Sequence, residues 1–126
     1  MAVMATAHPI DILIRLLGEG RFDYSDESEC QRQIAVFLTE RGVTFTKEHD
    51  LGGAGICDFY FTKSRIVLEV KAGKQWNKRE VYRQCERYCR HDEVQGLVLA
   101  TGRIQGMPPT ICGKPVRVYQ LGLGFL

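Results

Sequence analysis

Two strand-like segments, residues 56–61 and 65–71, flank a short turn, and this pair limits the folds open to the chain more than any other feature. Both segments are rich in β-branched, aromatic and long apolar residues, which favour strands. A turn centred between residues 63 and 64 pairs residues whose numbers sum to 127. The pairs on one face are then Phe61 with Ile66, Phe59 with Leu68 and Cys57 with Val70. We therefore predict an antiparallel hairpin with one wholly apolar face.

The other face of the same hairpin is predicted to carry charges. It places Asp58 directly opposite Glu69, with Lys71 one step beyond on the same face. Two carboxylates paired in this way have Cβ atoms about 5 Å apart and repel each other. A shared proton, a neighbouring cation or a bound divalent metal would each offset the repulsion. The alternative is a solvated polar face with an ordinary contact between Glu69 and Lys71.

The remaining pattern predicts helices and strands on either side of the hairpin. Pro9 suits the start of a helix at residues 8–18, and Gly18 suits its end. Ser25 can cap a second helix, which Gly42 ends. Further segments are a strand at 43–48, a flexible connection at 51–55, a helix at 76–90, and strands at 94–100 and 116–121. This order predicts one α/β domain, residues 1–126, built around a mixed sheet.

The composition agrees with one soluble globular domain. The chain has 126 residues, of which 44% are apolar and 25% charged, and no apolar run approaches the roughly 20 residues that span a bilayer. The N-terminus lacks a basic segment before its apolar stretch, so we expect no signal peptide. Five cysteines without a C-x-x-C pair indicate a reduced, cytoplasmic protein. Cys85 and Cys89 lie four apart and could share a metal, but packing as small hydrophobic residues is favoured.

Positive charge is concentrated in residues 71–91. Seven Lys and Arg residues stand there against two Glu, a net charge of +5 in a chain whose total is +2, so the rest sums to −3. Such a local field suggests a polyanionic partner, and phosphate contacts give affinity without sequence preference. The candidate nucleic-acid-binding residues are Lys74, Trp76, Lys78, Arg79, Arg83 and Arg87. The alternatives are a solvated helix face for the arginines and a core position for Trp76, which could otherwise stack on an exposed base.

The charged face of the hairpin fits the needs of phosphodiester hydrolysis. Asp58 and Glu69 could hold Mg²⁺, which prefers oxygen ligands. The backbone carbonyl of Val70 could supply another ligand. Lys71 could orient the attacking water or stabilise the transition state.

A third carboxylate could come from the preceding helix. Glu27 lies seven residues before Ile34 and so shares its helical face, whereas Glu29 is displaced from that face. Both could instead be first-turn charges that the helix dipole favours. The sequence leaves these two interpretations open.

Together these residues resemble the active site of the PD-(D/E)xK nuclease superfamily. The matching residues are Glu27 in the first core helix, Asp58 in GICDFYF, and Glu69 and Lys71 in LEVK. The helix VYRQCERYCRHDEV and the strand QGLVLATG also resemble that family's next elements, with Gln84 where a Gln often lies near the site. The match covers about residues 25–101, and Cys57 stands where the family often has proline.

The resemblance implies both a fold and an activity. The implied fold is a restriction endonuclease-like core over about residues 25–101, a central four-stranded mixed sheet flanked by helices, with an extra N-terminal helix in an extension at 1–24. The implied activity is cleavage of DNA that depends on Mg²⁺ or Mn²⁺. Asp58 and Glu69 would ligate the metal, and Lys71 would assist the water. Glu27 would complete the acidic cluster, and Gln84 would support the site.

The sequence contains no helix-turn-helix and no zinc finger that could read bases. We therefore expect an endonuclease that selects DNA structure rather than sequence. Branched or single-stranded DNA is the expected partner, in recombination, repair or phage DNA processing, with a prokaryotic or viral origin and a homodimer as further expectations. The alternatives are a non-catalytic nucleic-acid-binding module and a subunit of a larger DNA-processing assembly.

Overall fold

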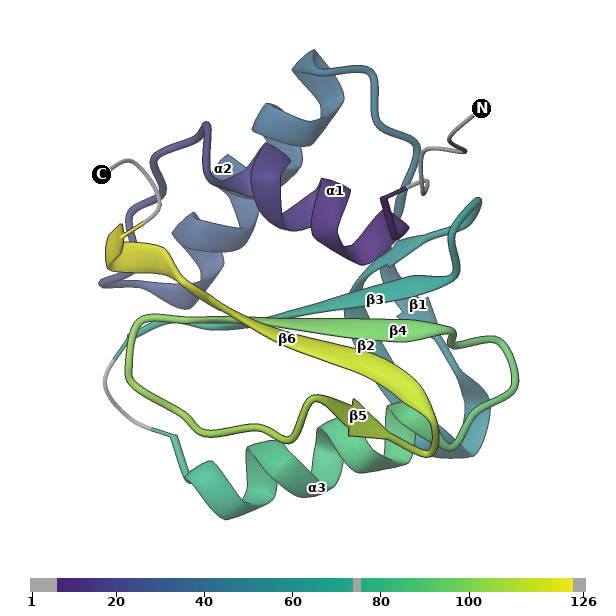
Figure 1. Ribbon diagram of the computed structural model, residues 1–126. Coiled ribbons are helices and arrows are strands. Elements are labelled where there is room, and N and C mark those ends of the chain that lie inside the picture. The colour runs from purple at the N-terminus through teal and green to yellow at the C-terminus, as the bar shows by residue number, and fades with distance from the viewer. Residues whose placement is uncertain (1–6, 74–75, 124–126) are drawn as a thin grey trace, which may run out of the picture.

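The computed structural model describes residues 7–73 and 76–123, and these form three layers (Figure 1). Two helices, α1 (Pro9–Leu17) and α2 (Glu27–Glu40), cover one face of a mixed sheet, and α3 (Lys78–Cys89) covers the other. The strands are β1 (Thr46–Asp50), β2 (Ile56–Phe61), β3 (Ile66–Lys71), β4 (Gly96–Thr101), β5 (Thr110–Ile111) and β6 (Lys114–Gln120). Short 3₁₀ turns lie at Gly52–Ala54 and Leu121–Leu123. The predicted α/β class is confirmed.

The sheet has six strands in the order β1-β2-β3-β4-β6-β5, so the expected central sheet of four strands is wrong in number. β1, β2 and β3 are antiparallel neighbours, whereas β3, β4 and β6 run parallel. Cys112 and Gly113 both have positive φ, 53° and 75°, which is the geometry of a tight hairpin turn. This turn folds the two-residue strand β5 back on β6, and a strand so short has no periodicity to predict it.

The element boundaries shift by a few residues because the capping residues differ from those expected. Asp26, rather than Ser25, caps α2 by accepting a hydrogen bond from the Glu29 N–H at 2.9 Å. The side chain of Asn77 caps α3, which therefore begins at residue 78 instead of 76. The first strand covers 46–50 rather than 43–48.

The core has two parts, one on each side of the sheet. The part under α1 and α2 includes Ile10 and Leu17 from α1, together with Tyr119 and Leu121 near the C-terminal end. The Tyr119 hydroxyl donates a hydrogen bond to the Leu17 carbonyl at 2.9 Å, which joins α1 to β6. The segments before residue 25 and after residue 101 thus pack into the same core as the residues between them. Across the described ranges, no helix is long and apolar enough to cross a membrane.

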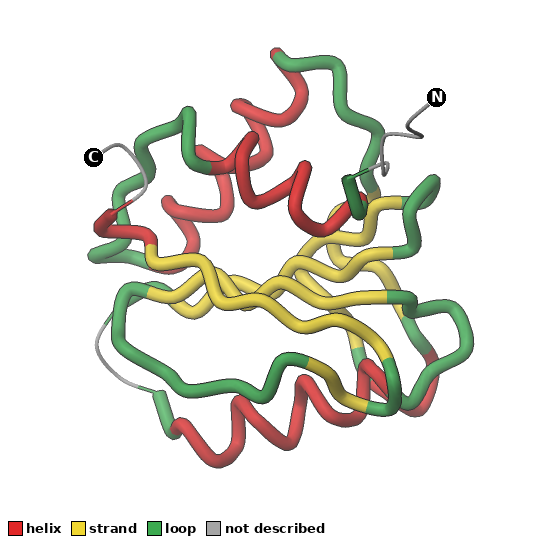
Figure 2. Tube along the Cα trace, viewed as in Figure 1, coloured by secondary structure: helices red, strands yellow, loops and turns green. Residues whose placement is uncertain are grey.

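The β4 to β6 connection crosses the sheet without a helix (Figure 2). A loop over residues 102–109 followed by β5 makes this crossover on the same side as α3. The Gln105 side chain donates to the Lys78 carbonyl at 3.0 Å, and Arg103 donates to the Trp76 carbonyl at 3.2 Å. The loop is therefore fastened to the beginning of α3.

The predicted hairpin register is confirmed at its turn end, where Phe59 pairs with Leu68 and Phe61 with Ile66. The prediction for Cys57 is wrong, because this residue is buried on the α3 side and not beside Phe59.

The cause is a kink in β1 and β2. Lys47 pairs with Phe59 and His49 pairs with Cys57, so Glu48 lies opposite Asp58. The φ of Glu48 is 52°, in the left-handed region. Beyond this kink the side chains change face, so that the His49 ring stacks on Tyr60 with centroids 4.3 Å apart.

Candidate active site

Beyond the Phe59–Leu68 pair, side chains replace the backbone ladder between β2 and β3. The Asp58 N–H donates to Glu69 Oε1 at 3.1 Å, and the Val70 N–H donates to Asp58 Oδ2 at 2.7 Å. Each carboxylate thus has one oxygen anchored by the backbone of the neighbouring strand. The two acids predicted to face each other are therefore held together at the open end of the hairpin.

The surroundings of this acid pair favour its protonated form. Glu69 is 1% exposed. Burial, reinforced by the charge of Asp58, raises the pKa of Glu69 to about 8. Burial also raises the pKa of Asp58, although the Val70 N–H and the charge of Lys71 act in the opposite direction. The shifts therefore favour retention of a proton by the pair, and a shared proton is one of the three predicted ways to offset the repulsion.

Lys71 lies at the end of β3, beside the acid pair. Its Nζ is 3.7 Å from Glu69 Oε2, and its side chain is 19% exposed. An ammonium at this distance partly compensates the carboxylate charge, and it is also open to the adjoining cavity described below. The predicted proximity of Lys71 to Glu69 is thus present in the structure.

Glu27, the first residue of α2, comes close to the same group of charges. Burial raises its pKa and the charge of Asp58 adds to this, whereas Lys71 and the Ala72 N–H act in the opposite direction. Glu29 instead bonds Arg32 on its own helix, with oxygen–nitrogen distances of 2.9 and 2.6 Å. Glu27 is therefore the glutamate of this turn that can act together with the acid pair.

Gln84 reaches the site through a tyrosine that the sequence analysis missed. Its Nε2 donates to the Tyr88 hydroxyl at 2.9 Å, and that hydroxyl donates to the Ile56 carbonyl at 2.9 Å. Gln84 and Tyr88 thereby tie α3 to the start of β2, two residues before Asp58. A buried tyrosine needs a hydrogen-bond partner for its hydroxyl, and this was the signal available in the sequence.

A cavity of about 600 Å³ adjoins the acid pair on the side of α3. Lys71 and Gln84 line it together with Trp76, Arg83 and Arg87. Asp58 and Glu69 are not among its lining residues, so Lys71 forms the link between the acid pair and this cavity.

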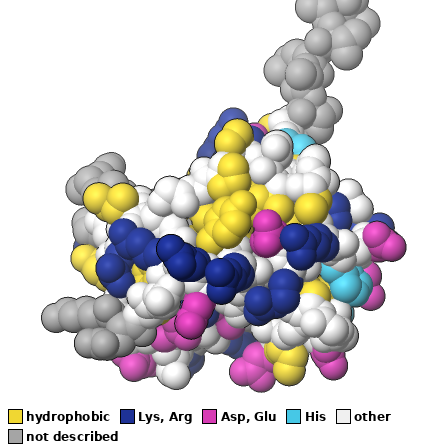
Figure 3. Space-filling model, turned by 90° about the horizontal axis from the view of Figure 1, so that it is seen from below, with side chains coloured by type: hydrophobic (Ala, Val, Ile, Leu, Met, Phe, Trp, Pro, Cys, Tyr) yellow, Lys and Arg dark blue, Asp and Glu magenta, His cyan; other side chains and the backbone are white. Residues whose placement is uncertain are grey.

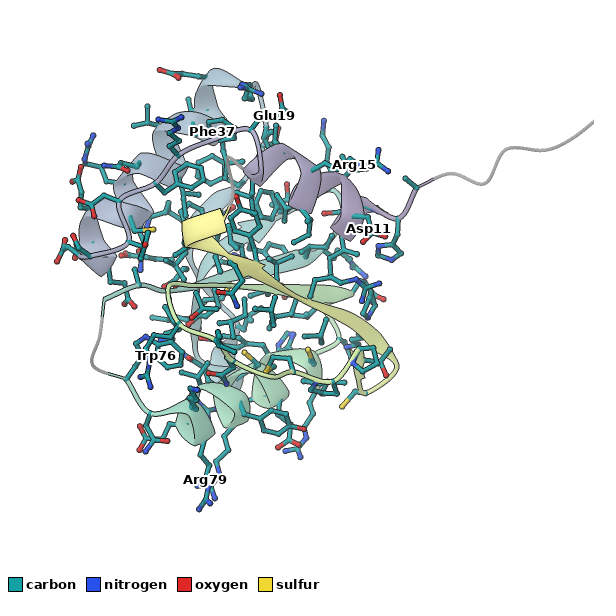
Figure 4. The ribbon with its side chains drawn as sticks, turned by 60° about the vertical axis from the view of Figure 1, so that its left-hand side comes forward. Asp11, Arg15, Glu19, Phe37, Trp76 and Arg79 are labelled. Atoms are coloured by element: carbon teal, nitrogen blue, oxygen red, sulfur yellow. The ribbon has the colours of Figure 1, made fainter. Side chains whose placement is uncertain are left out.

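The other predicted nucleic-acid-binding residues are placed differently. Lys78 and Arg79 are exposed on the first turn of α3, and Arg79 points away from the molecule (Figure 4). Lys74 lies outside the described residues. Seen from below, Lys and Arg side chains form a row across this face of the molecule (Figure 3). The predicted basic surface is therefore present, but only part of it borders the cavity.

The carboxylates of Asp58 and Glu69 are oxygen donors, which suit a hard cation, but there are only two of them at this point of the sheet. Within residues 7–73 and 76–123, no three Asp, Glu, His or Cys side chains form a group that could hold a metal ion. Asp58 and Glu69 are nevertheless adjacent oxygen donors, and Mg²⁺ is commonly bound through one or two carboxylates with water completing its shell. The acid pair therefore fits Mg²⁺ or Mn²⁺ as a two-carboxylate site.

The cysteines do not add to this donor set. Cys57, Cys85 and Cys89 are fully buried. Burial raises the pKa of the Cys57 and Cys85 thiols to about 12 and that of Cys89 to about 11. A metal ligand or nucleophile would need the thiolate, so these residues act as packing groups, as the sequence favoured.

Comparison with known proteins identifies no relative from which the roles of these residues could be inferred. No family model matches the chain, and neither a curated protein nor a solved structure matches it. The resemblance to the PD-(D/E)xK nucleases therefore remains a hypothesis carried by Glu27, Asp58, Glu69 and Lys71.

Proposed function

We propose that this chain is a DNA endonuclease of the PD-(D/E)xK type that depends on Mg²⁺ or Mn²⁺. The single observation that carries the proposal is the pair of carboxylates on β2 and β3, Glu69 buried and Asp58 half-buried, each anchored by the backbone of the other strand, with the Lys71 ammonium 3.7 Å from Glu69. Burying two like charges is unfavourable unless something compensates them. A bound divalent cation explains why the chain keeps both acids at one point.

Each residue has a distinct part in this proposal. Asp58 and Glu69 hold the cation, and their backbone anchors fix them before it binds. The cation would neutralise the charge that develops on the phosphate oxygens. Lys71 orients the attacking water or stabilises the charge of the transition state. Glu27 completes the acidic group as a nearby charge and not as a ligand of the cation.

Two groups support these residues. The Val70 carbonyl is a further proposed ligand, and the Val70 N–H already anchors Asp58. Gln84 positions the start of β2 through Tyr88. The proposed core is restriction endonuclease-like, with β1, β2, β3 and β4, which are neighbours in the sheet, as its four strands. A homodimer and a preference for DNA structure over sequence belong to the same proposal.

The test is a cleavage assay with plasmid, linear and branched DNA, in Mg²⁺, Mn²⁺ or chelator. We expect cation-dependent cleavage, and we expect Lys71→Ala to lower the rate about 100- to 1,000-fold because a positioned charge next to the reacting phosphate is lost. Lys63→Ala, in the exposed turn at the far end of the hairpin, is the matched control and should cleave at the wild-type rate. If no substrate is cut, or Lys71→Ala cuts as fast as wild type, the proposal fails.

The non-catalytic alternative is favoured by one observation, the lack of a third metal-holding side chain within the described residues. A nucleic-acid-binding module, alone or as a subunit of a larger assembly, would use the basic face of α3 without cleaving DNA. It predicts binding that weakens with salt and survives Asp58→Ala, with no product in either cation. The same assay separates the two functions.

A further inference from the structure

The cavity beside Lys71 has a layout of its own. On α3, Glu80 is followed by Arg83 and Gln84 three and four residues later, and these in turn by Arg87, so the four side chains share one face and line the cavity together. The stripe that packs into the core is formed by Val81, Cys85, Tyr88 and Cys89, and of these only Val81 also lines the cavity. This face of α3 is therefore turned toward an open space and not toward protein.

The charge of the cavity suits a phosphate chain. Lys71, Arg83 and Arg87 line it against a single acid, Glu80. The lining extends along α3 from Asn77 to Arg87, a length of about 15 Å at 1.5 Å per residue. In a duplex each strand carries a phosphate about every 3.4 Å along the helix axis, and an unpaired strand is more extended, so this length holds at most about four phosphates. Lys71 lies at the edge shared with the acid pair.

Trp76 gives the cavity an aromatic wall. The Arg103 guanidinium lies over its ring, 4.9 Å from the centroid, and also donates to the Trp76 carbonyl. The ring is thus braced from the 102–109 loop, and Figure 4 places it just above the start of α3. The ring also packs against the core on the α3 side, and its Nε1 is buried with no hydrogen-bond partner within the described part of the chain. An aromatic ring within a basic groove is how single-stranded nucleic acid is commonly bound.

The size of the cavity separates a single strand from a duplex. Its volume of about 600 Å³ is in the range of pockets for small ligands, roughly 300–1,000 Å³. In a duplex each base is stacked and paired and cannot reach into the cavity. The duplex is also wider than its own major groove, which is about 12 Å across, so it can lie over this cavity but cannot enter it. A nucleotide without a pairing partner can place its base against Trp76 and its phosphates against the arginines.

We propose that this cavity binds an unpaired nucleotide next to the phosphate held at Lys71. The substrate of the proposed endonuclease is then DNA that is single-stranded at the cleavage position, and this inference rests on the proposed function. Arg83 and Arg87 hold the strand, and Trp76 stacks on its base. Blunt duplex DNA binds the outer basic surface without filling the cavity.

The protein contains a single tryptophan, so its own fluorescence reports on the cavity. In chelator, which prevents cleavage, oligothymidylate should quench this fluorescence saturably, whereas a blunt duplex of equal length should leave it nearly unchanged. The double variant Arg83→Ala/Arg87→Ala should weaken the titration with oligothymidylate at least tenfold and reduce its salt dependence. Arg15→Ala removes a charge from α1 on the opposite layer and should have no effect (Figure 4).

Anisotropy of a labelled oligothymidylate extends the test to Trp76 itself. Trp76→Ala should weaken binding about 5- to 100-fold, the range for loss of one stacked base. Trp76→Phe keeps an aromatic wall and should retain most of the affinity, which covers the case in which Trp76→Ala fails to fold.

Equal quenching by duplex and single strand, or unchanged affinity of the arginine double variant, would overturn the inference. In Mg²⁺, cleavage of blunt duplex as fast as of single-stranded or flapped DNA would overturn it and leave the proposed function standing. Quenching by the single strand without cleavage of any DNA would support the cavity as a binding site and overturn the proposed function.

Discussion

The two ends of the β2–β3 hairpin differ in what occupies the space between the strands. At the turn end, Phe59 pairs with Leu68 and Phe61 with Ile66 in a regular antiparallel ladder, and all four side chains are buried and apolar. At the open end, only a few residues away, the backbone N–H groups of Asp58 and Val70 donate to carboxylates instead of to backbone carbonyls. The same two strands therefore hold a conventional core and a group of closely spaced ionisable side chains, of which Glu69 is buried and Asp58 and Lys71 are half-buried.

This difference shows which end serves stability and which end serves chemistry. Apolar burial at the turn end stabilises the fold at every pH. The acid pair at the open end is held in place by the surrounding structure although its charges repel each other. Sites that oppose stability in this way are where function is expected, and removing them commonly stabilises a protein.

The largest effect is expected at the turn end. Leu68 is fully buried, so Leu68→Ala should lower the free energy of unfolding by about 2–5 kcal/mol through lost burial and a residual cavity. Urea denaturation followed by circular dichroism measures this, with Lys63→Ala as a surface control. A loss below about 1 kcal/mol would mean that the turn end does not support the fold as described.

A smaller effect of opposite sign is expected at the open end. Glu69 has a pKa of about 8 in the folded protein against an ordinary value of 4.5, so the folded state holds the proton more tightly. Its contribution is complete below about pH 4.5 and is lost as the pH rises toward 8. Wild-type stability should fall over this range, and Glu69→Gln should fall less.

At pH 8, Glu69→Gln should therefore be more stable than wild type by about 1–2 kcal/mol while cleavage is lost. Melting curves between pH 5 and pH 8.5, run in chelator, give the comparison. A variant that is less stable than wild type at pH 8 would make Glu69 a structural residue and remove the contrast between the two ends.

The smallest effect concerns the kink that separates the two ends. A β-branched residue adopts the positive φ of Glu48 less readily than glutamate does, so Glu48→Val should cost about 0.5–1 kcal/mol. Glu48→Gly should be close to neutral because glycine adopts this conformation freely. Thermal melts of the two variants test the kink, and equal stability would show that the backbone there is ordinary strand.

Much of this hairpin could be predicted from its sequence because a short turn fixes the register of both strands. The same register brought Asp58 opposite Glu69 and placed Lys71 near them. The face of Cys57 could not be predicted, since it depends on the left-handed conformation of Glu48 in another strand. Glutamate carries no local signal for such a conformation.

Contacts between segments that lie far apart in the chain could not be predicted from the sequence either. The contact of Arg103 with Trp76 spans 27 residues and depends on the path of the 102–109 loop. The role of Gln84 was expected at the site, but its actual contact is Tyr88, whose position follows from the packing of α3. Local patterns predicted the α-helices and strands other than β5 and their order, whereas the contact of the crossover loop with Trp76 depends on the path of the loop.

The bond between the Tyr119 hydroxyl and the Leu17 carbonyl has a consequence for how the molecule is made. It links residues 102 positions apart, and the apolar side of α1 packs against residues near Tyr119 as well as against the rest of the sheet. A chain growing from its N-terminus must therefore keep α1 incompletely covered until β6 has been synthesised. Of the three α-helices in the described part of the chain, α1 therefore waits longest in sequence for the strand that completes its contacts, and its apolar side is the one expected to stay exposed longest during translation.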